Sequence, residues 1–258
     1  MAGDQGTPYI QFIHVFKSFG DLKVLEDVSF EVRRGEMVTV LGRSGVGKSV
    51  TLKHILGFIK PDSGEVFVDG SGVSRMSEAE LSQVRRRVTM VFQSGALFDS
   101  LTVGENVAYP LRERALRGAP MDEDQIEARI SELLALVDLD DSKDLKPSDL
   151  STGMKRAVAI ARALAAEPEA ILYDEPTTMV DPLMARTVGD LILKLKRQKG
   201  LTSVVVTHDM KLARKLSDRV VFLEQGRVAF FGTPTEMDSS SDPLIREFME
   251  LDEVSFSN

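Results

Sequence analysis

The sequence predicts an α/β fold with a mainly parallel sheet and an inserted helical segment. Three short runs of apolar residues are typical of parallel strands buried on both faces: MVTVLG at 37–42, AILYDE at 170–175 and SVVVTHD at 203–209. Each run is followed by a turn and a helical pattern, which is the alternation expected of an α/β domain.

The region between the first two runs, about 99–154, is predicted to be a helical insertion. Five of its apolar residues fall on one helical face: Ile126, Ile130, Leu133, Leu134 and Val137. Further on, residues 220–232 alternate around a Gln-Gly pair, which predicts a β-hairpin. The tail beyond about 236 ends in an amphipathic segment, PLIREFMEL. We expect this segment to pack on its own domain, and the alternative is a contact across a dimer.

The composition favours a globular domain and argues against nucleic-acid binding. The 258 residues can bury a full core, and 43% apolar with 28% charged residues is an ordinary balance. A net charge of −8 is unlike the basic face of a nucleic-acid binder, and the absence of cysteine excludes disulfides and thiolate metal sites. We expect neither a signal peptide nor a membrane span, since the start lacks the signal pattern and no 18 apolar residues run together.

The clearest motif is a phosphate loop. Residues 42–49 match the pattern G-x-x-x-x-G-K-[ST] between a predicted strand and a predicted helix. Glycines let backbone N–H groups curl around a β-phosphate, Lys48 reaches the β and γ oxygens, and the Ser49 hydroxyl can bind Mg²⁺. The predicted phosphate-binding residues are Gly42, Arg43, Ser44, Gly45, Val46, Gly47, Lys48, Ser49 and Val50.

An acidic pair follows the second apolar run. Asp174 ends the predicted strand and is expected to support Mg²⁺ through water, and Glu175 comes next. As a general base Glu175 needs a raised pKa, which the negative charges of Asp174 and the phosphates favour. Alternatively, Glu175 only orients the attacking water. An acidic pair is more often a solvated turn, but the buried run before it and Pro176 after it argue against that interpretation.

Two polar residues at predicted strand ends are weaker candidates. His208 ends the run 203–209, at the edge where open α/β sheets bind ligands, and Gln93 closes the run VTMVFQ. His14 and His54 have no such placement, so we interpret them as structural.

A second helix start suited to an anion lies at 149–164, DLSTGMKRAVAIARAL. Ser151 and Thr152 can cap the helix, and Gly153 lets a ligand approach the backbone. Three basic residues are expected to keep its first turns positive: Lys155, Arg156 and Arg162.

The order of these motifs resembles the nucleotide-binding subunit of ATP-binding cassette (ABC) transporters over nearly the whole chain. Residues 150–154, LSTGM, correspond to the family's signature, usually LSGGQ. The resemblance implies a phosphate-loop NTPase (RecA-like) core at about 8–98 and 155–235, with an N-terminal antiparallel β region. It also implies a helical subdomain at about 99–154 and a short tail at about 236–258, all within one nucleotide-binding domain.

The resemblance also implies that two copies pack head to tail around two ATP molecules and Mg²⁺. Each ATP then lies between the phosphate loop of one copy and Ser151 and Gly153 of the other. An exposed helix dipole contributes only ~0.3–1 kcal/mol, so this helix start would complete a site that the other copy has mostly built.

Further roles follow from matching positions. Phe19 would stack on adenine, Gln93 would contact Mg²⁺ and the attacking water, and His208 would contact the γ-phosphate. Ser49, Gln93 and Asp174 would surround Mg²⁺, and Asp181 would link the two sites. The departures are Thr152 and Met154 in the signature, and Met179 and Val180 before Asp181. Ser151 and Gly153 remain in the signature, so its phosphate-facing donors are expected to survive.

Two stretches resemble the ATPases of Mla/Mce-type phospholipid transport systems: residues 48–70 and FQSGALFDSLTVGENVAYPLRE at 92–113. Val50 after Ser49 also fits that subgroup. The resemblance implies a permease in the inner membrane, an Mce-type lipid-binding protein and, in some assemblies, an accessory subunit. The chain would lie on the cytoplasmic face of that membrane through the permease.

Three alternatives share part of this pattern. The first is an importer ATPase for another cargo, such as polar amino acids, which would have the same catalytic residues as a phospholipid transport ATPase. A non-transport ABC ATPase usually has two cassettes or a long coiled coil, and neither is found here. A phosphate-loop GTPase would have an Asn-Lys-x-Asp motif, which the sequence lacks.

Overall fold

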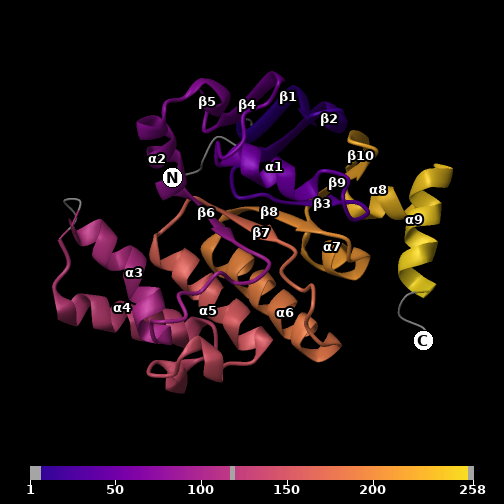
Figure 1. Cartoon of the computed structure of the whole chain (residues 1–258). Helices are drawn as coiled ribbons and strands as arrows, with labels where there is room; N and C mark the ends of the chain where they lie inside the picture. Colours follow the sequence, from indigo (N-terminus) through magenta and orange to yellow (C-terminus); the bar gives the residue numbers. More distant parts are fainter. Residues whose placement is uncertain (1–6, 117–119, 255–258) are drawn as a thin grey trace. The chain divides into compact units, whose positions relative to one another are not determined.

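The computed structural model describes residues 7–116 and 120–254, and the chain forms two compact units. The first unit combines Met1–Leu81 with Thr202–Asn258, and the second is Ser82–Leu201. The helices and strands of both are labelled in Figure 1.

The first unit contains an antiparallel sheet near the N-terminus, with strand order β2-β1-β4-β5. Its strands are β1 (Pro8–Phe19), β2 (Leu22–Arg33), β4 (Ser63–Val68) and β5 (Ser71–Gly72). The rings of Phe12 and Phe30 stack 4.5 Å apart on neighbouring strands. This sheet confirms the N-terminal antiparallel region that the family resemblance implied.

The parallel strands of the first unit are β3 (Met37–Leu41), β8 (Thr202–Thr207) and β9 (Arg219–Glu224). β3 pairs with both β8 and β9, and every residue of β3 and β8 is buried, which explains their continuous apolar sequence. β10 (Arg227–Gly232) completes the predicted hairpin with β9. Gln225 and Gly226 make its turn with φ values of 47° and 76°, as a type I′ turn requires.

Within the part of the first unit that the structure describes, the helices that do not leave it are α1 (Lys48–Ile55), α7 (Met210–Leu216), α8 (Pro234–Asp238), α9 (Pro243–Val254) and the 3₁₀ helix η1 (Val73–Arg75). The tail helix α9 packs within this unit, as expected. Its Ile245 and Phe248 join a buried cluster with Leu41, Met210 and Phe222.

The second unit contains one parallel strand pair, β6 (Val88–Val91) with β7 (Ala170–Asp174). α2 (Glu78–Arg87) runs from the first unit into the second. The other helices of this unit are α3 (Val103–Leu116), α4 (Glu123–Leu136), α5 (Thr152–Ala165), α6 (Pro182–Lys199), and the short η2 (Asp140–Ser142) and η3 (Pro147–Asp149).

Among the described residues, the α-helices α3 and α4 and the short η2 and η3 lie within the predicted helical insertion. α3 and α4 pack side by side (Figure 1). The five apolar residues predicted to share one helical face, four in α4 and Val137 directly after it, are all buried. A capping box of Asp122 and Gln125 begins α4. These contacts confirm the helical character of the segment.

Candidate nucleotide-binding site

The phosphate loop joins β3 to α1 within the first unit. Gly45 and Gly47 have φ values of 84° and 104°, which residues with a side chain rarely adopt. A Cβ atom on Gly47 would also lie 2.8 Å from the carbonyl oxygen of Val24, so only glycine fits there. The N-cap position of α1 is occupied by Gly47, which has no side chain to cap the helix. Its backbone N–H groups therefore suit a phosphate.

Lys48 is the first residue of α1 and is buried. Its ammonium group donates to the carbonyl oxygens of Gly42 at 2.8 Å and Arg43 at 3.0 Å. Both bonds hold the cation on the loop that is predicted to surround the phosphates. Replacing these carbonyls by phosphate oxygens would keep the ammonium group hydrogen-bonded and add charge neutralisation.

The strand register brings His208 to the same sheet edge as the phosphate loop. Leu41 of β3 pairs with Thr207 of β8, so Gly42 and His208 both follow the carboxyl ends of neighbouring parallel strands. β8 ends two residues earlier than the run 203–209 had predicted. Asp209 instead caps α7 by accepting the backbone N–H of Leu212 at 2.9 Å. His208 is exposed in the link between strand and helix.

Phe19 ends β1 and is 48% exposed. The ammonium group of Lys17 lies 5.5 Å from its ring centroid. An exposed ring with a nearby cation can stack on a purine base.

The acidic pair lies at the carboxyl end of β7 in the second unit. Four buried residues precede the half-buried Asp174, and Glu175 is 9% exposed. Glu175 has a φ of 47°, a region that side-chain-bearing residues seldom adopt and that is common at functional sites. The Thr178 hydroxyl donates to its Oε2 at 2.8 Å and fixes the carboxylate.

Gln93 lies at the same edge as this pair. β6 ends at Val91, which pairs with Tyr173 of β7, so the residues that follow both strands leave the sheet together. Gln93 is exposed, two residues beyond the strand end. The second unit therefore brings Gln93, Asp174 and Glu175 to one edge.

The signature helix is α5, and Ser151 caps it as expected. The Ser151 hydroxyl accepts the backbone N–H of Met154 at 3.2 Å. The space beside Gly153 is filled by a side chain of α6, because a Cβ at this position would lie 2.2 Å from the terminal methyl group of Met184. A ligand approaching the Gly153 backbone would have to displace that flexible methyl group. Asp181 caps α6 through the backbone N–H groups of Leu183 and Met184.

Arg156 and Arg162 do not form the basic helix start that the sequence suggested. Arg156 is 4% exposed and donates to the carbonyl oxygens of Phe92 at 3.2 Å and Thr178 at 3.4 Å. Burial lowers the pKa of both guanidinium groups, although arginine stays charged in proteins. Arg156 thus connects the residue before Gln93 to the turn after Glu175.

Arg162 joins α5 to the segment that follows Gln93. It donates to the Gly95 carbonyl at 3.0 Å and to Asn106 of α3 at 3.4 Å, and its guanidinium carbon lies 5.5 Å from the Phe98 ring centroid. A sequence signal for both arginines existed. Both stand among the apolar residues of α5, and a charged side chain that packs among apolar residues needs hydrogen-bond partners.

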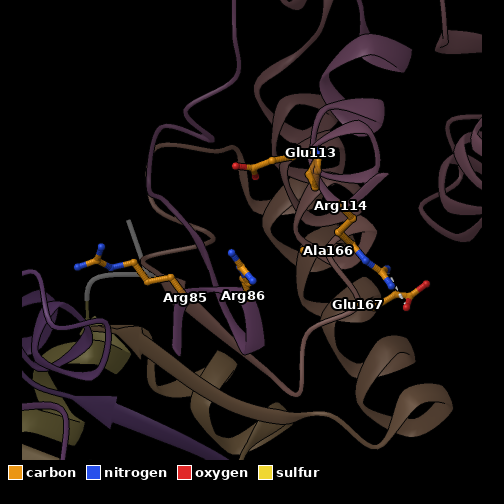
Figure 2. Close-up of a pocket in the computed structure, with 7 residues that line it drawn as sticks. Arg85, Arg86, Glu113, Arg114, Ala166 and Glu167 are labelled. Atoms are coloured by element: carbon orange, nitrogen blue, oxygen red, sulfur yellow. Dashed lines mark ion pairs between the residues drawn. The ribbon is translucent and has the colours of Figure 1, made fainter. Parts of the chain in front are cut away.

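A separate pocket in the second unit contains none of the predicted site residues. It has a volume of about 330 Å³ and is lined by Arg85, Arg86, Pro110, Glu113, Arg114, Ala166 and Glu167. Figure 2 shows Arg114 paired with Glu167, at 2.8 Å. Since the lining carries three arginines and two glutamates, it is nearly balanced in charge and does not suit a triphosphate.

Comparison with known proteins decides the family. Residues 25–178 match the family described as ABC transporter. The chain belongs to the ABC transporter family. A dimeric ATP-binding cassette in a post-hydrolysis state, bound to ADP and Pi, has a TM-score of 0.79 and 35% identity, covering 87% of this chain and 98% of that one. The chain is therefore an ABC-type ATPase with the phosphate-loop NTPase fold, and it uses ATP with Mg²⁺.

Three curated relatives have names that point to different roles. The chloroplastic protein TRIGALACTOSYLDIACYLGLYCEROL 3 of Arabidopsis thaliana is 40% identical, covering 91% of this chain and 71% of that protein. The methionine import ATP-binding protein MetN of Carboxydothermus hydrogenoformans is 39% identical over 88% and 66%. The intermembrane phospholipid transport system ATP-binding protein MlaF of Escherichia coli is 37% identical over 90% and 84%.

The residues of this site fit ATP and Mg²⁺. Gly45 and Gly47 give the loop the positive φ values that a phosphate loop requires, and the Ser49 hydroxyl is an oxygen ligand of the kind that Mg²⁺ prefers. In the second unit, Gln93 and Asp174 also carry oxygen ligands of that kind. Across residues 7–116 and 120–254, no cluster of three or more acidic, histidine or cysteine side chains forms a metal site. Mg²⁺ usually keeps several waters and few protein ligands, so this finding is consistent with it. In the same ranges, no helix could cross a membrane.

Proposed function

We propose that this ATPase energises phospholipid transport by a membrane permease with an Mce-type lipid-binding partner. The similarity to MlaF carries the proposal, because it extends over 90% of this chain and 84% of that protein. The stretch 92–113 supports it, since this segment resembles the Mla/Mce-type ATPases. The similarity to MetN favours a second candidate, an importer for a small polar cargo.

We assign the chemistry of the site as follows. Gly42 to Val50 bind the phosphates, Lys48 neutralises the β and γ oxygens, and Phe19 stacks on adenine. Ser49, Gln93 and Asp174 would hold Mg²⁺, Asp174 through water, and the bound ion would supply neutralisation of the charge that develops on the phosphates.

Glu175 either accepts a proton from the attacking water or orients it. Its hydrogen bond from Thr178 suits both roles, since it fixes one oxygen of the carboxylate. His208 contacts the γ-phosphate as a switch. Gln93 couples ATP binding to the helical subdomain, 99–154.

Each site needs a second copy of the chain. Ser151 and Gly153 of one subunit complete the ATP site of the other, head to tail, and Asp181 links the two sites. The dimeric state of the solved relative with ADP and Pi supports this arrangement. A helix N-terminus alone contributes too little to hold ATP, so ATP joins the two subunits and hydrolysis releases them.

The permease docks on an exposed apolar patch in the second unit, formed by Phe98, Leu101, Tyr109 and Leu116. Tyr109 is 50% exposed and Leu116 is 88% exposed, and a pocket of about 380 Å³ lies between residues of this patch. Phe98 packs against Tyr109 with ring centroids 5.0 Å apart. Arg162 of α5 contacts both Phe98 and the carbonyl oxygen of Gly95. Because Gly95 is only two residues from Gln93, a permease helix bound to this patch is coupled to Gln93.

This arrangement puts the chain on the cytoplasmic face of the inner membrane, held there by the permease. We retain the division into a core at about 8–98 and 155–235, a helical subdomain at about 99–154 and a tail at about 236–258.

Capture of tagged Glu175→Gln protein with ATP and Mg²⁺ from gently solubilised membranes tests the cargo. Recovery of an Mce-type protein, a permease and phospholipid supports lipid transport. A permease with a soluble solute-binding protein would overturn the cargo and keep the catalytic assignments. Recovery without any membrane partner would contradict a transport role.

A further inference from the structure

The tail helix α9 contacts the phosphate loop directly. The guanidinium group of Arg43, the second residue of the loop, forms an ion pair with Glu247 of α9, at 2.7 Å between Nη2 and Oε1. The two residues are 204 positions apart and belong to the same unit.

The apolar face of α9 fixes the helix against the strand that leads into the loop. Ile245 and Phe248 are 2% and 7% exposed, and they share a cluster with Leu41, the residue before Gly42. The rings of Phe248 and Phe222 lie 4.8 Å apart. Glu247 is therefore held beside Arg43 by a packed helix, and the pair does not depend on a loose tail.

Both the backbone and the side chain of Arg43 form hydrogen bonds. Its carbonyl oxygen accepts the ammonium group of Lys48 at 3.0 Å, while its side chain pairs with Glu247. The two side chains of the ion pair are 47% and 60% exposed, so the pair is weak and can open. A triphosphate on the loop offers the same guanidinium several anionic oxygens in place of one carboxylate, in geometry suited to two parallel hydrogen bonds.

We propose that the Arg43 side chain is a further phosphate-binding group of the ATP site and that Glu247 withholds it. This inference rests on the proposed phosphate-loop assignment. Glu247 and the phosphates compete for one guanidinium group, so docking of α9 lowers ATP affinity. By linkage, ATP binding weakens the docking of α9 by the same factor.

The test is a titration of the full-length variants with a fluorescent ATP analogue at low and physiological salt. Glu247→Gln lowers the Kd about two- to fivefold, the range that an exposed ion pair can contribute. Arg43→Gln raises the Kd. In the Arg43→Gln background, Glu247→Gln has no more effect than a matched control.

The control is Glu250→Gln, which removes the same charge from an exposed position on the same helix. Equal Kd values for Glu247→Gln and Glu250→Gln would overturn the proposal. So would tightening by Glu247→Gln that persists without Arg43, since it would show a general effect of charge. Thermal unfolding of each variant verifies that the fold is intact, and Glu247→Asp restores the Kd toward that of the parent protein.

Lys48→Ala in the same titration tests the phosphate-loop assignment separately from the role of Arg43 and Glu247. Retained binding by Lys48→Ala would refute the phosphate-loop assignment itself. Loss of binding by Lys48→Ala, with Glu247→Gln equal to its control, would refute only the role of Arg43 and Glu247.

Discussion

Replacement of Arg156 by methionine is expected to slow ATP hydrolysis without abolishing ATP binding. The change removes the two hydrogen bonds that join the Phe92 carbonyl, next to Gln93, to the Thr178 carbonyl, in the turn after Glu175. Thr178 also holds the Glu175 carboxylate, so the variant loosens Gln93 and Glu175 together.

The expected magnitude follows from these two contacts. At 3.2 and 3.4 Å both are long, and water can partly replace them at Phe92, which is 39% exposed. Each lost bond then costs about 1 kcal/mol, and removal of a buried charge offsets part of the sum. We expect a net loss of ~1–2 kcal/mol in the free energy of unfolding, which lowers Tm by about 3–6 °C. A misplacement near 1 Å at the reacting groups lowers kcat by about tenfold to a hundredfold.

The assay measures kcat at saturating MgATP, beside the Kd for ATP and the urea midpoint. Lys155→Met is the matched control, since it removes the neighbouring positive charge of the same helix and leaves both carbonyl contacts in place. A kcat within twofold of the parent protein, with the expected loss of stability, would refute the role of Arg156 in holding Gln93 and Glu175.

Three further predictions address other parts of the account. Lys48→Ala loses most ATP binding in equilibrium titration, because the ammonium group on the phosphate loop is gone; normal turnover with retained micromolar binding would contradict the assignment. Ser151→Arg abolishes turnover but leaves ATP binding to the isolated subunit nearly intact, and loss of binding in the monomer would mean that the signature helix acts within its own subunit. His54 is 1% exposed, and burial lowers its pKa, so the unfolded chain binds the proton first as pH falls. The free energy of unfolding therefore falls between pH 7 and 5.5, by at most ~1.4 kcal/mol per pH unit. In urea titrations, His54→Leu makes the free energy of unfolding less dependent on pH. An equal dependence in both proteins would exclude His54 as its source.

The elements that the sequence predicted well are those with local signals. The runs at β3, β7 and β8 are buried throughout, or nearly so, and need no knowledge of their neighbours. The Gln-Gly turn of the β9–β10 hairpin and the cap of α6 at Asp181 also depend only on adjacent residues. The long strands β1 and β2 gave no such signal, because register shifts in their pairing break the alternation of buried and exposed positions.

Contacts between residues far apart in the chain could not be predicted from the sequence. The pairing of Arg43 with Glu247 leaves no local pattern, since each is an ordinary exposed charge in its own segment. Basic residues at a helix start suggested an anion site, but Arg156 points into the protein, where the carbonyl oxygens of Phe92 and Thr178 accept its hydrogen bonds. Gly153 was expected to make room for a ligand, and the space beside it holds Met184.

The central claim is that one subunit's signature helix completes the other subunit's ATP site, and sedimentation of Glu175→Gln with ATP and Mg²⁺ tests it most directly. Because a positioned base contributes about 10²–10⁴-fold, this variant should bind ATP, hydrolyse it very slowly and accumulate as a dimer. Adding Ser151→Arg should return it to a monomer that still binds ATP. A Glu175→Gln protein that stays monomeric with ATP, even beside its permease, would contradict the account.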